Sequence, residues 1–449
     1  MNKGTMVKFF IDQHGCAKNQ VDGEEIAARL ESGGYSYCDS PQDAEVIIVN
    51  TCGFIESAKQ ESISAVIDAK THWPGKKIIV AGCLSQRYPE ALLQDLAEAD
   101  GIFGNSDLSK IAEIVERVVR GERSLIASPQ PRTIDEKAFR RTRLFDFPGT
   151  AHVKITEGCS NHCSYCAIPL IRGELRSRSM ADILEECTDL GNRGIHEINL
   201  IGQDLASYGK DLPGNSASLP ALLREMARLP YAFRIRVLYI HPDHFPFDLL
   251  DIMQKNPRIL PYFDIPFQHA AEQLLASMNR HGSAERYLQL IERIRTSLPD
   301  VMIRSTFMTG FPGETEEDFA ILRDFQEAAR LDWLGVFAYS REEDTPAYSY
   351  KNRVPKKLAE SRKRQIEERQ QVITEERLAR FIGQTVEVVI EELVENEALS
   401  LGRAWMQAPD VDGLTVVHGK HEPGSLVKAR IEAIHGVDLE AAPLSPEQS

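Results

Sequence analysis

The sequence has no apolar run as long as the roughly 18 residues that a membrane-spanning helix requires. Its first residues, Met1 to Met6, also lack the apolar stretch of a secretory signal peptide. Basic residues are in deficit: the formal net charge is -15 at pH 7, and such a charge repels nucleic-acid phosphates over the molecule as a whole. We therefore expect a cytoplasmic protein with no membrane partner and no direct, sequence-specific binding of nucleic acid.

A disulfide framework is also not expected. A reducing cytoplasm disfavours disulfides, so any patterned group among the eight cysteines is better explained as a metal site or a catalytic site. Hydrophobic residues at 42% and charged residues at 27% are typical of folded proteins. At 449 residues the chain is too long for one ordinary core, which favours two or three domains.

Short apolar runs alternate with helical patterns in the first third of the chain. We expect strands over residues 7–11, 46–49 and 78–81, with helices near 22–31, after Phe54 and after Pro89. This order predicts βαβ units on a parallel, Rossmann-like sheet. Residues 128–148 include Pro129, Pro131 and several charges, which indicates a linker to a second domain.

The alternation restarts at His152 and continues through six further units. Candidate strands cover residues 153–155, 197–201, 234–240, 262–267, 301–308 and 333–339, and candidate helices cover 181–191, 219–228, 246–254, 284–296 and 316–329. Six βα units predict an open (β/α)6 barrel, because a closed eightfold barrel needs two more. A charged helix over 356–381 and short β-runs at 386–390, 414–417 and 426–434 follow, which predicts a small all-β barrel at the end.

Three cysteines lie in one short segment after the first strand of the central domain. We call Cys159, Cys163 and Cys166 the central cysteine loop. Three thiolates can hold three irons of a 4Fe-4S cluster, which normally takes four protein ligands. The fourth iron is then open to a chelating molecule; the amino and carboxylate groups of S-adenosylmethionine suit it, and electron transfer into the sulfonium would release a radical. The alternative is a structural zinc site with His162 as the fourth ligand.

Three other cysteines are far apart in sequence, but each has the same position relative to an expected strand. Cys16, Cys52 and Cys83, the N-terminal cysteine set, each stand just after one of the first three expected strands. Because parallel strands end at one edge of a sheet, their sulfurs can converge. The alternative is three buried structural cysteines. Cys38 and Cys187 fit neither set, and we expect them to be structural.

The spacing Cys-x₃-Cys-x₂-Cys, with Tyr165 before the last cysteine, resembles the radical S-adenosylmethionine superfamily. Together with the N-terminal cysteine set and a terminal β-barrel, it resembles the methylthiotransferases over nearly the whole chain. The resemblance implies a methylthiotransferase domain over 1–145, a radical domain over 147–375 and a TRAM-like β-barrel over 383–446. It also implies two 4Fe-4S clusters, one that cleaves S-adenosylmethionine and one that presents sulfur, and an electron donor such as flavodoxin or ferredoxin.

Other segments match the family's pattern. They are Gly15-Cys16-Ala17-Lys18-Asn19, Asn50-Thr51-Cys52, Ile171-Arg172-Gly173-Glu174-Leu175-Arg176-Ser177-Arg178, Leu200-Ile201-Gly202-Gln203-Asp204 and Gly310-Phe311-Pro312-Gly313-Glu314. Polar groups and flexible backbone at strand ends suit a cofactor site, although Gly-Phe-Pro-Gly is equally typical of a simple turn. We expect cofactor or substrate contacts from Tyr165, Arg178, Gln203, Gln268 and Arg304; a structural or solvated role is the alternative for the last four.

The family modifies either an adenosine in transfer RNA, the MiaB type, or an aspartate of small-subunit ribosomal protein S twelve. Residues 383–449 contain four basic and twelve acidic residues, an excess that repels RNA and attracts a basic protein. The segments 16–22, 202–204, 264–269 and 408–413 resemble the ribosomal-protein branch, although Gly23 and Trp405 depart from the family's usual Ser and Tyr. We expect methylthio insertion at the β-carbon of that aspartate, with transfer RNA as the alternative substrate.

A binding module is the rival class of function. In that case the clusters would be structural and the acidic barrel would only dock on the ribosome, but structural metal sites are coordinatively closed, whereas both cysteine sets leave an open position. We expect the acidic barrel to dock the basic ribosomal protein. The alternative is that its carboxylates serve solubility alone.

Overall fold

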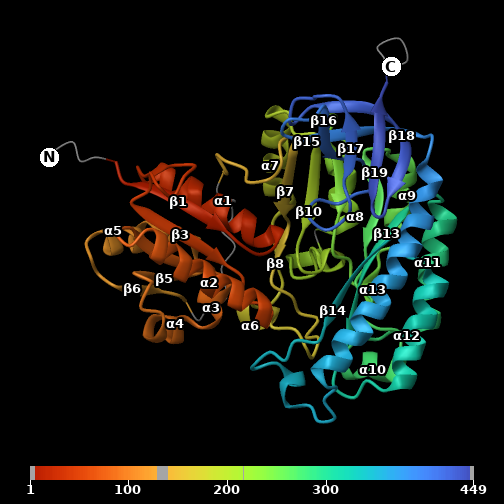
Figure 1. The fold of residues 1–449 in the computed structure, drawn as a ribbon, viewed down its shortest axis with the longest axis horizontal. Coiled ribbons are helices and arrows are strands. Elements are labelled where there is room, and N and C mark those ends of the chain that lie inside the picture. The colour runs from red at the N-terminus through yellow and green to blue at the C-terminus, as the bar shows by residue number, and fades with distance from the viewer. Residues whose placement is uncertain (1–5, 129–139, 216, 445–449) are drawn as a thin grey trace. The chain divides into compact units, whose positions relative to one another are not determined.

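The computed structural model describes residues 6–128, 140–215 and 217–444, and the chain divides into two compact units (Figure 1). The first unit holds Met1–Phe145, Lys154–Asp182 and Ser340–Tyr348, and the second holds Asp146–Val153, Ile183–Tyr339 and Ser349–Ser449. The expected linker at 128–148 lies largely outside the described residues. Within the described ranges, no helix has the length and apolar character that crossing a membrane requires.

The first unit is built on a six-stranded parallel sheet with the order β2-β1-β3-β4-β5-β6. Its strands are β1 (Lys8–Gln13), β2 (Ser36–Tyr37), β3 (Val46–Thr51), β4 (Lys77–Gly82), β5 (Gly101–Gly104) and β6 (Ser124–Ile126). Helices α1 (Ala17–Ser32) and α5 (Ile111–Val119) pack on one face, and α2 (Glu56–His72), α3 (Cys83–Arg87) and α4 (Pro89–Asp95) pack on the other. The expected parallel α/β domain is confirmed.

Strand β3 explains why this sheet could be predicted. Val46 and Ile48 pack into the core beneath α1 and α5, whereas Ile47 and Val49 pack into the core on the opposite face. A strand buried on both faces is a continuous apolar run, which is easily recognised. Strands β2, β6 and β5 have only two, three and four residues, so their apolar runs are too short to stand out. The alternation therefore predicted three of the six strands.

The second unit contains the central sheet, with the order β14-β13-β12-β11-β10-β7. These strands are β7 (Thr150–Lys154), β10 (Glu197–Ile201), β11 (Arg234–Val237), β12 (Ile259–Asp264), β13 (Met302–Thr309) and β14 (Trp333–Ala338). The helices along this part of the chain are α7 (Met180–Asn192), α8 (Leu219–Met226), α9 (Asp248–Lys255), α10 (Glu272–Ser277), α11 (Ala284–Ser297), α12 (Glu316–Ala329) and α13 (Lys356–Leu378). Sheet order follows chain order, and β10 to β14 pair in parallel, as expected for an open barrel of six βα units.

A closed five-stranded barrel completes the second unit, with the order β15-β16-β17-β19-β18. Its strands are β15 (Thr385–Leu393), β16 (Leu399–Arg403), β17 (Thr415–His418), β18 (Leu426–His435) and β19 (Asp438–Pro443). The barrel was predicted, but β16 and β19 were missed. In β16, Ser400 and Gly402 interrupt the apolar pattern. Both residues are needed in the barrel interior. Ser400 is fully buried and donates to the Gly419 carbonyl, and a side chain at Gly402 would meet the backbone of β15.

The barrel is fixed to the central sheet by buried charges. Glu197, on β10, accepts from Arg236 at 3.1 Å and from Arg403, on β16, at 3.2 Å. Burial alone would raise the pKa of Glu197, but the two guanidinium groups lower it to about 2. Trp333 Nε1 also donates to the Met406 carbonyl at 2.8 Å. This junction makes the central sheet and the barrel one compact unit.

Candidate functional site

The N-terminal cysteine set lies at the carboxyl edge of the first sheet. Cys16 follows β1 as the N-cap of α1, Cys52 follows β3 directly, and Cys83 begins α3 directly after β4. The three strands are neighbours whose pairing places Gln13 beside Asn50 and Thr51 beside Gly82. The structure therefore brings the three cysteines to one edge of the sheet, as parallel strands of equal register require.

Two glycines allow these loops to approach closely. Gly15 has a φ of +89°, and a Cβ there would lie 3.0 Å from Cys52 Cβ and 3.6 Å from its sulfur. A Cβ on Gly53 would come within 2.9 Å of the Cys83 backbone. Larger residues would push the loops apart, so the glycines keep the three cysteine loops together.

Buried amides hold the same loops. Asn19 Nδ2 donates to the carbonyls of His14, Asn50 and Thr51 at 2.7, 3.2 and 3.2 Å. In turn, Asn50 Nδ2 donates a hydrogen bond to the Asn19 carbonyl at 2.8 Å. These bonds tie the His14 loop and the first turn of α1 to the end of β3, so the cysteine loops are held in one conformation.

Burial and nearby charge affect the three thiols differently. Burial raises the pKa of Cys83 to about 12, and Arg172 opposes this shift, while the charges of Cys16 and Cys52 add to it. Burial also raises the pKa of Cys52. Cys16 is exposed, and Lys18 and Arg172 lower the pKa of its thiol. Because the charge of one thiolate raises the pKa of another, the three sulfurs share one electrostatic environment. A metal cluster bound to the three sulfurs would replace their protons.

The central cysteine loop is closed at its base by a short antiparallel pair, β8 (Thr156–Glu157) and β9 (Arg176–Ser177). Cys159 N donates to the Gly173 carbonyl at 3.1 Å, and Ser160 Oγ donates to Glu174 at 2.5 Å. Cys166 N donates to the Cys163 carbonyl at 3.0 Å, which forms a tight turn. The loop then enters helix α6 (Ile168–Arg172). All three cysteines of the loop therefore project from one short, tied segment.

His162 was the expected fourth ligand in the zinc alternative. Its Nε2 lies 3.6 Å from Glu174, and its side chain is 57% exposed. Among the described residues, no three His, Cys, Asp or Glu side chains are close enough together to hold a single metal ion. A cluster of four irons has a different requirement, because its cysteines surround a core larger than one ion. Three thiolates from one loop provide the donor chemistry that such a cluster uses.

Both cysteine sets belong to the first unit, and Cys83 contacts the helix that follows the central cysteine loop. Cys83 packs with Ala167 and Ile171, which follow the central cysteine loop. Arg172, at the end of α6, donates from Nη2 to Cys83 Sγ at 3.2 Å. Neither this contact nor the role of Arg172 was expected from the sequence, although Arg172 lies in one of the segments that match the family.

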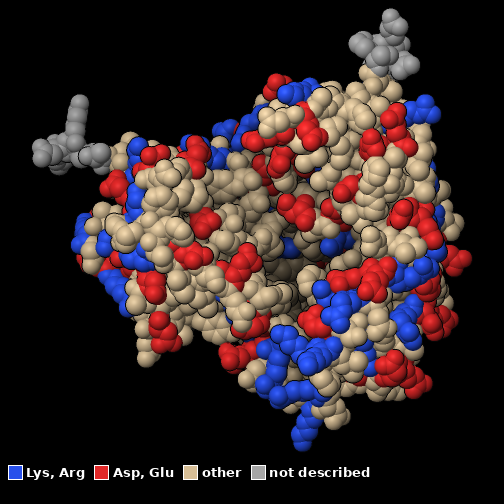
Figure 2. Space-filling model, viewed as in Figure 1, with Lys and Arg blue, Asp and Glu red and all other residues tan. Residues whose placement is uncertain are grey.

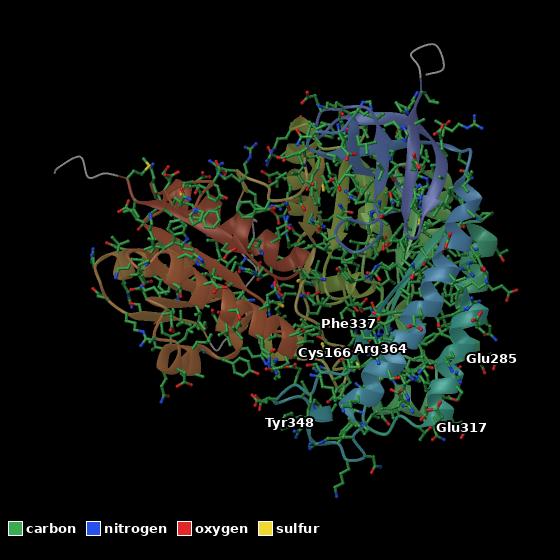
Figure 3. The ribbon with its side chains drawn as sticks, in the orientation of Figure 1. Cys166, Glu285, Glu317, Phe337, Tyr348 and Arg364 are labelled. Atoms are coloured by element: carbon green, nitrogen blue, oxygen red, sulfur yellow. The ribbon has the colours of Figure 1, made fainter. Side chains whose placement is uncertain are left out.

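A second link between the sets is the segment Ser340–Tyr348. Glu342 pairs with Arg87 at 2.7 Å and with Lys59 at 3.1 Å, and Arg87 also donates to the carbonyl of Gly53 beside Cys52. A few residues later, Ala347 N donates to the Ser164 carbonyl of the central cysteine loop at 2.8 Å; Figure 3 labels Tyr348 and Cys166 in these two segments. Sequence reasoning missed this segment, since it has no regular pattern.

The other expected contact residues are divided between the units. Tyr165 lies in the central cysteine loop, and Arg178 is buried in the first unit, where it donates to Asp182 at 2.7 Å and to the Lys154 carbonyl at 2.8 Å. Gln203, Gln268 and Arg304 lie in the second unit. The structure therefore places these residues in two separate groups.

In the second unit, Gln203 follows β10, and both its side-chain amide atoms are buried without a hydrogen-bond partner among the described residues. Gln268 has a φ of +69°, and its backbone bonds to Thr306 and Met308 of β13. Arg304 is held 3.3 Å from Asp264 and 3.4 Å from Asp412 of the barrel. The amide of Gln203 is thus the best suited of the three for a ligand, whereas Arg304 is committed to two carboxylates.

The two remaining cysteines have structural surroundings. Cys187 is fully buried in α7. Cys38 lies 3.3 Å from the Phe9 carbonyl and 3.4 Å from the Ser40 carbonyl. Burial raises the pKa of Cys38, so its thiol is protonated and poorly reactive at neutral pH.

Several carboxylates of the acidic barrel are already paired with arginines. Glu387 pairs with Arg234, Glu391 with Arg403, and the fully buried side chain of Asp412 with Arg304. Exposed carboxylates include Glu392, Glu395 and Glu397 on and beside the turn between β15 and β16. Figure 2 shows Asp and Glu distributed over the visible face of the barrel with some Lys and Arg among them. The charge available for docking is therefore smaller than the sequence suggests.

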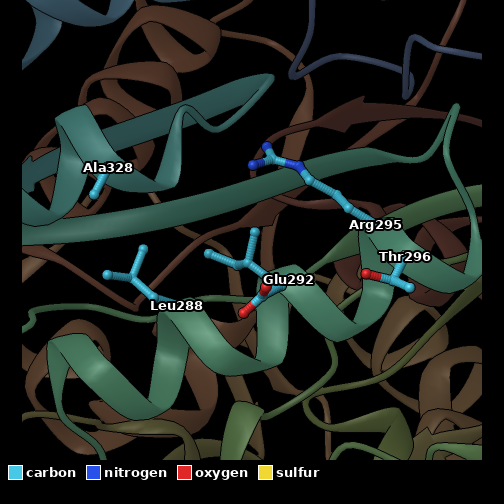
Figure 4. Close-up of a pocket in the computed structure, with 6 residues that line it drawn as sticks. Leu288, Glu292, Arg295, Thr296 and Ala328 are labelled. Atoms are coloured by element: carbon cyan, nitrogen blue, oxygen red, sulfur yellow. The ribbon is translucent and has the colours of Figure 1, made fainter.

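A surface pocket of the second unit lies apart from any cysteine. It is lined by α11 and α12, including Leu288, Glu292 and Ala328 (Figure 4). Arg295 in its wall donates to the carbonyls of Ala329 and Arg330, which end α12. Arg295 therefore caps the C-terminal end of α12.

Three parts of the chain match models of known protein families. Residues 8–104 match the family described as uncharacterized protein family UPF0004, residues 153–325 match the radical SAM superfamily, and residues 382–444 match the TRAM domain. The chain is 47% identical to the ribosomal protein uS12 methylthiotransferase RimO of Treponema denticola, covering 96% of this chain and 99% of that protein. It is 40% identical to the RimO of Desulfotalea psychrophila, covering 98% and 100%.

Solved structures share the fold at low sequence identity. The radical S-adenosylmethionine methyltransferase TsrM of Kitasatospora setae, with cobalamin and a 4Fe-4S cluster bound, is 15% identical over 77% of each chain, with a TM-score of 0.58. The cobalamin-dependent S-adenosylmethionine radical enzyme OxsB has a TM-score of 0.51 and 10% identity, over 81% of this chain and 56% of that one. At such identities the similarity extends to the fold alone.

Proposed function

Because the chain belongs to the RimO family of radical SAM methylthiotransferases, we propose that it inserts a methylthio group at the β-carbon of an aspartate in ribosomal protein uS12. The protein is a transferase that uses S-adenosylmethionine and iron-sulfur chemistry. The observation that carries the proposal is the presence of two three-cysteine sets in one unit, where Arg172, which follows one set, contacts Cys83 of the other at 3.2 Å.

We propose that each cysteine set holds one 4Fe-4S cluster. The central cysteine loop supplies three thiolates, with Tyr165 beside the last, and leaves the fourth iron to S-adenosylmethionine. The N-terminal cysteine set supplies three more thiolates at the edge of the first sheet. When bound, the clusters and S-adenosylmethionine supply the radical chemistry and the sulfur and methyl groups of the reaction.

The chain's own residues keep the two sites in place. Asn19 and Asn50 fix the loops of the N-terminal set, and β8 and β9 close the central cysteine loop. We assign cofactor or substrate contacts to Arg178, Gln203, Gln268 and Arg304; the unpartnered buried amide of Gln203 favours it among them. Three functional domains follow: residues 1–145 for the second cluster, 147–375 for radical chemistry and 383–446 for docking of the substrate.

Docking on a basic ribosomal protein is assigned to the exposed carboxylates of the barrel, including Glu392, Glu395 and Glu397. Opposite charges accelerate encounter over a Debye length of about 8 Å at physiological ionic strength. We place the reaction in the cytoplasm, on uS12 in the ribosomal subunit, with flavodoxin or ferredoxin as the electron donor.

The proposal is tested with anaerobically reconstituted protein, a reductant and S-adenosylmethionine. An enzyme yields methionine and 5'-deoxyadenosine, and the Ala variant of the central cysteine loop yields neither. Addition of uS12 should give a methylthiolated product, whereas transfer RNA should not. Product on transfer RNA, or absence of cleavage by fully reconstituted protein, would overturn the proposal.

A further inference from the structure

Four charged side chains form a buried ring in the first unit, which we call the charge ring: Asp22, Lys154, Glu157 and Arg172. Arg172 Nη1 lies 3.0 Å from Asp22 and 2.8 Å from Glu157. Lys154 Nζ lies 2.7 Å from Glu157 and also pairs with Asp22. Each side chain is less than 10% exposed. Two cations and two anions thus alternate, and their charges cancel inside the ring.

The members of the ring come from the segments that carry both cysteine sets. Asp22 lies on α1, whose N-cap is Cys16. Glu157 stands two residues before Cys159, and Arg172 ends the short helix that follows Cys166. Moving any one of these segments would break a buried ion pair, which is strongly unfavourable because it leaves a charge uncompensated. The ring therefore resists displacement of either set relative to the other.

Arg172 is the member that also reaches a cysteine. Its Nη1 contacts the two carboxylates, while its Nη2 donates to Cys83 Sγ at 3.2 Å. A guanidinium presents several N–H donors in a rigid plane, so one side chain can meet carboxylates and a sulfur in fixed directions. Lysine has one nitrogen on a flexible stem and cannot reproduce this geometry. Asn105 adds a weaker contact to the same sulfur at 3.5 Å.

We propose that Arg172 is a positioning residue that directs Cys83 toward the second cluster and, through Asp22 and Glu157, fixes that ligand relative to the central cysteine loop. The inference rests on the proposed function, in which the N-terminal cysteine set holds a cluster. Hydrogen bonds to ligand sulfurs and nearby charge both set the reduction potential of an iron-sulfur cluster. A cation beside the ligand favours the reduced, more negative cluster, so Arg172 raises that cluster's potential.

The test is a redox titration of full-length protein that contains only the second cluster, with the central cysteine loop changed to Ala. Arg172→Gln and Arg172→Lys are compared with Arg141→Gln. Arg141 is the matched control, because it is a buried arginine of the same unit that pairs with Glu24. Iron content and the electron paramagnetic resonance spectrum are recorded for every variant.

We expect Arg172→Gln to lower the midpoint potential, Arg172→Lys to lower it less because the charge is retained, and Arg141→Gln to leave it unchanged. Loss of iron in both Arg172 variants, with iron retained in the control, would also support the proposal. Potentials equal to that of the parent protein in both Arg172 variants would overturn it. A parent protein that binds no iron would instead refute the second cluster itself, and so the proposed function.

Discussion

Glu197 is the buried carboxylate through which the barrel is fixed to the central sheet, and its replacement gives a sharp prediction. Glu197→Gln would leave Arg236 and Arg403 buried without their shared counter-charge. Its pKa of about 2, against an ordinary value of 4.5, corresponds to about 3 kcal/mol of stability at neutral pH. The cost of breaking buried ion pairs, about 3–5 kcal/mol, agrees in size. We therefore expect the free energy of unfolding to fall by about 3 kcal/mol.

The assay is urea unfolding of the full chain without metal, followed by tryptophan fluorescence. Trp333 and Trp405 both contribute to this junction, through Trp333 Nε1 to the Met406 carbonyl and through the Trp405 carbonyl to Arg236. The control is Glu440→Gln, a partly exposed barrel carboxylate that pairs only with exposed histidines among the described residues, and we expect little change in the free energy of unfolding from it.

The pH dependence of the same variant has a definite sign. A carboxyl group whose pKa is lowered on folding stabilises the protein above its unfolded pKa, and this contribution is lost as the pH falls through its folded pKa. The difference between wild type and Glu197→Gln should therefore be constant above about pH 5 and shrink between 4.5 and about 2. Equal unfolding free energies of the two proteins at pH 7 would refute the reasoning about this junction.

Three further predictions concern the clusters and the barrel. Reconstituted protein should bind about eight irons, and the Ala variant of the central cysteine loop about four; iron content unchanged in that variant would contradict the cluster assignment. The Ala variant of the N-terminal cysteine set should still cleave S-adenosylmethionine but form no methylthiolated product, and full product from it would show that this set is only structural. Changing Glu392, Glu395 and Glu397 together to Lys should raise the KM for uS12 in a salt-sensitive way without changing cofactor cleavage. An unchanged KM would mean that these carboxylates only keep the protein soluble, and preferential binding of transfer RNA by the wild type would revive that substrate.

The sequence was sufficient to predict the elements that have a clear local pattern and the cysteines whose positions follow from that pattern. Strand β10 was predicted at its observed bounds because Ile198, Leu200 and Ile201 mark it. The equivalent positions of Cys16, Cys52 and Cys83 could be seen from the parallel order of their strands. The fold class, the three-part architecture of its sheets and barrel, and the family are confirmed. The assignment of individual ligands and cofactor contacts stays a prediction.

What could not be predicted depends on partners distant in sequence. Glu391 is one of the twelve acidic residues on which the docking charge was counted, but it pairs with the buried Arg403. Replacing Glu391 by Lys would disrupt the junction with the central sheet, so the docking variant leaves it unchanged. Arg172 lay in a recognised segment, yet its contact with Cys83 joins positions 89 residues apart. The local sequence pattern cannot predict such a contact, because only folding brings the two side chains together.

The most direct test of the central claim is mass spectrometry of uS12 from cells. The gene for this protein would be deleted, and the strain would be complemented with the wild type or with the Ala variant of either cysteine set. We expect uS12 to gain the mass of one methylthio group in place of hydrogen, on an aspartate, only in the wild-type complement. An unmodified uS12 in that complement, or a modified uS12 in the deletion strain, would contradict it.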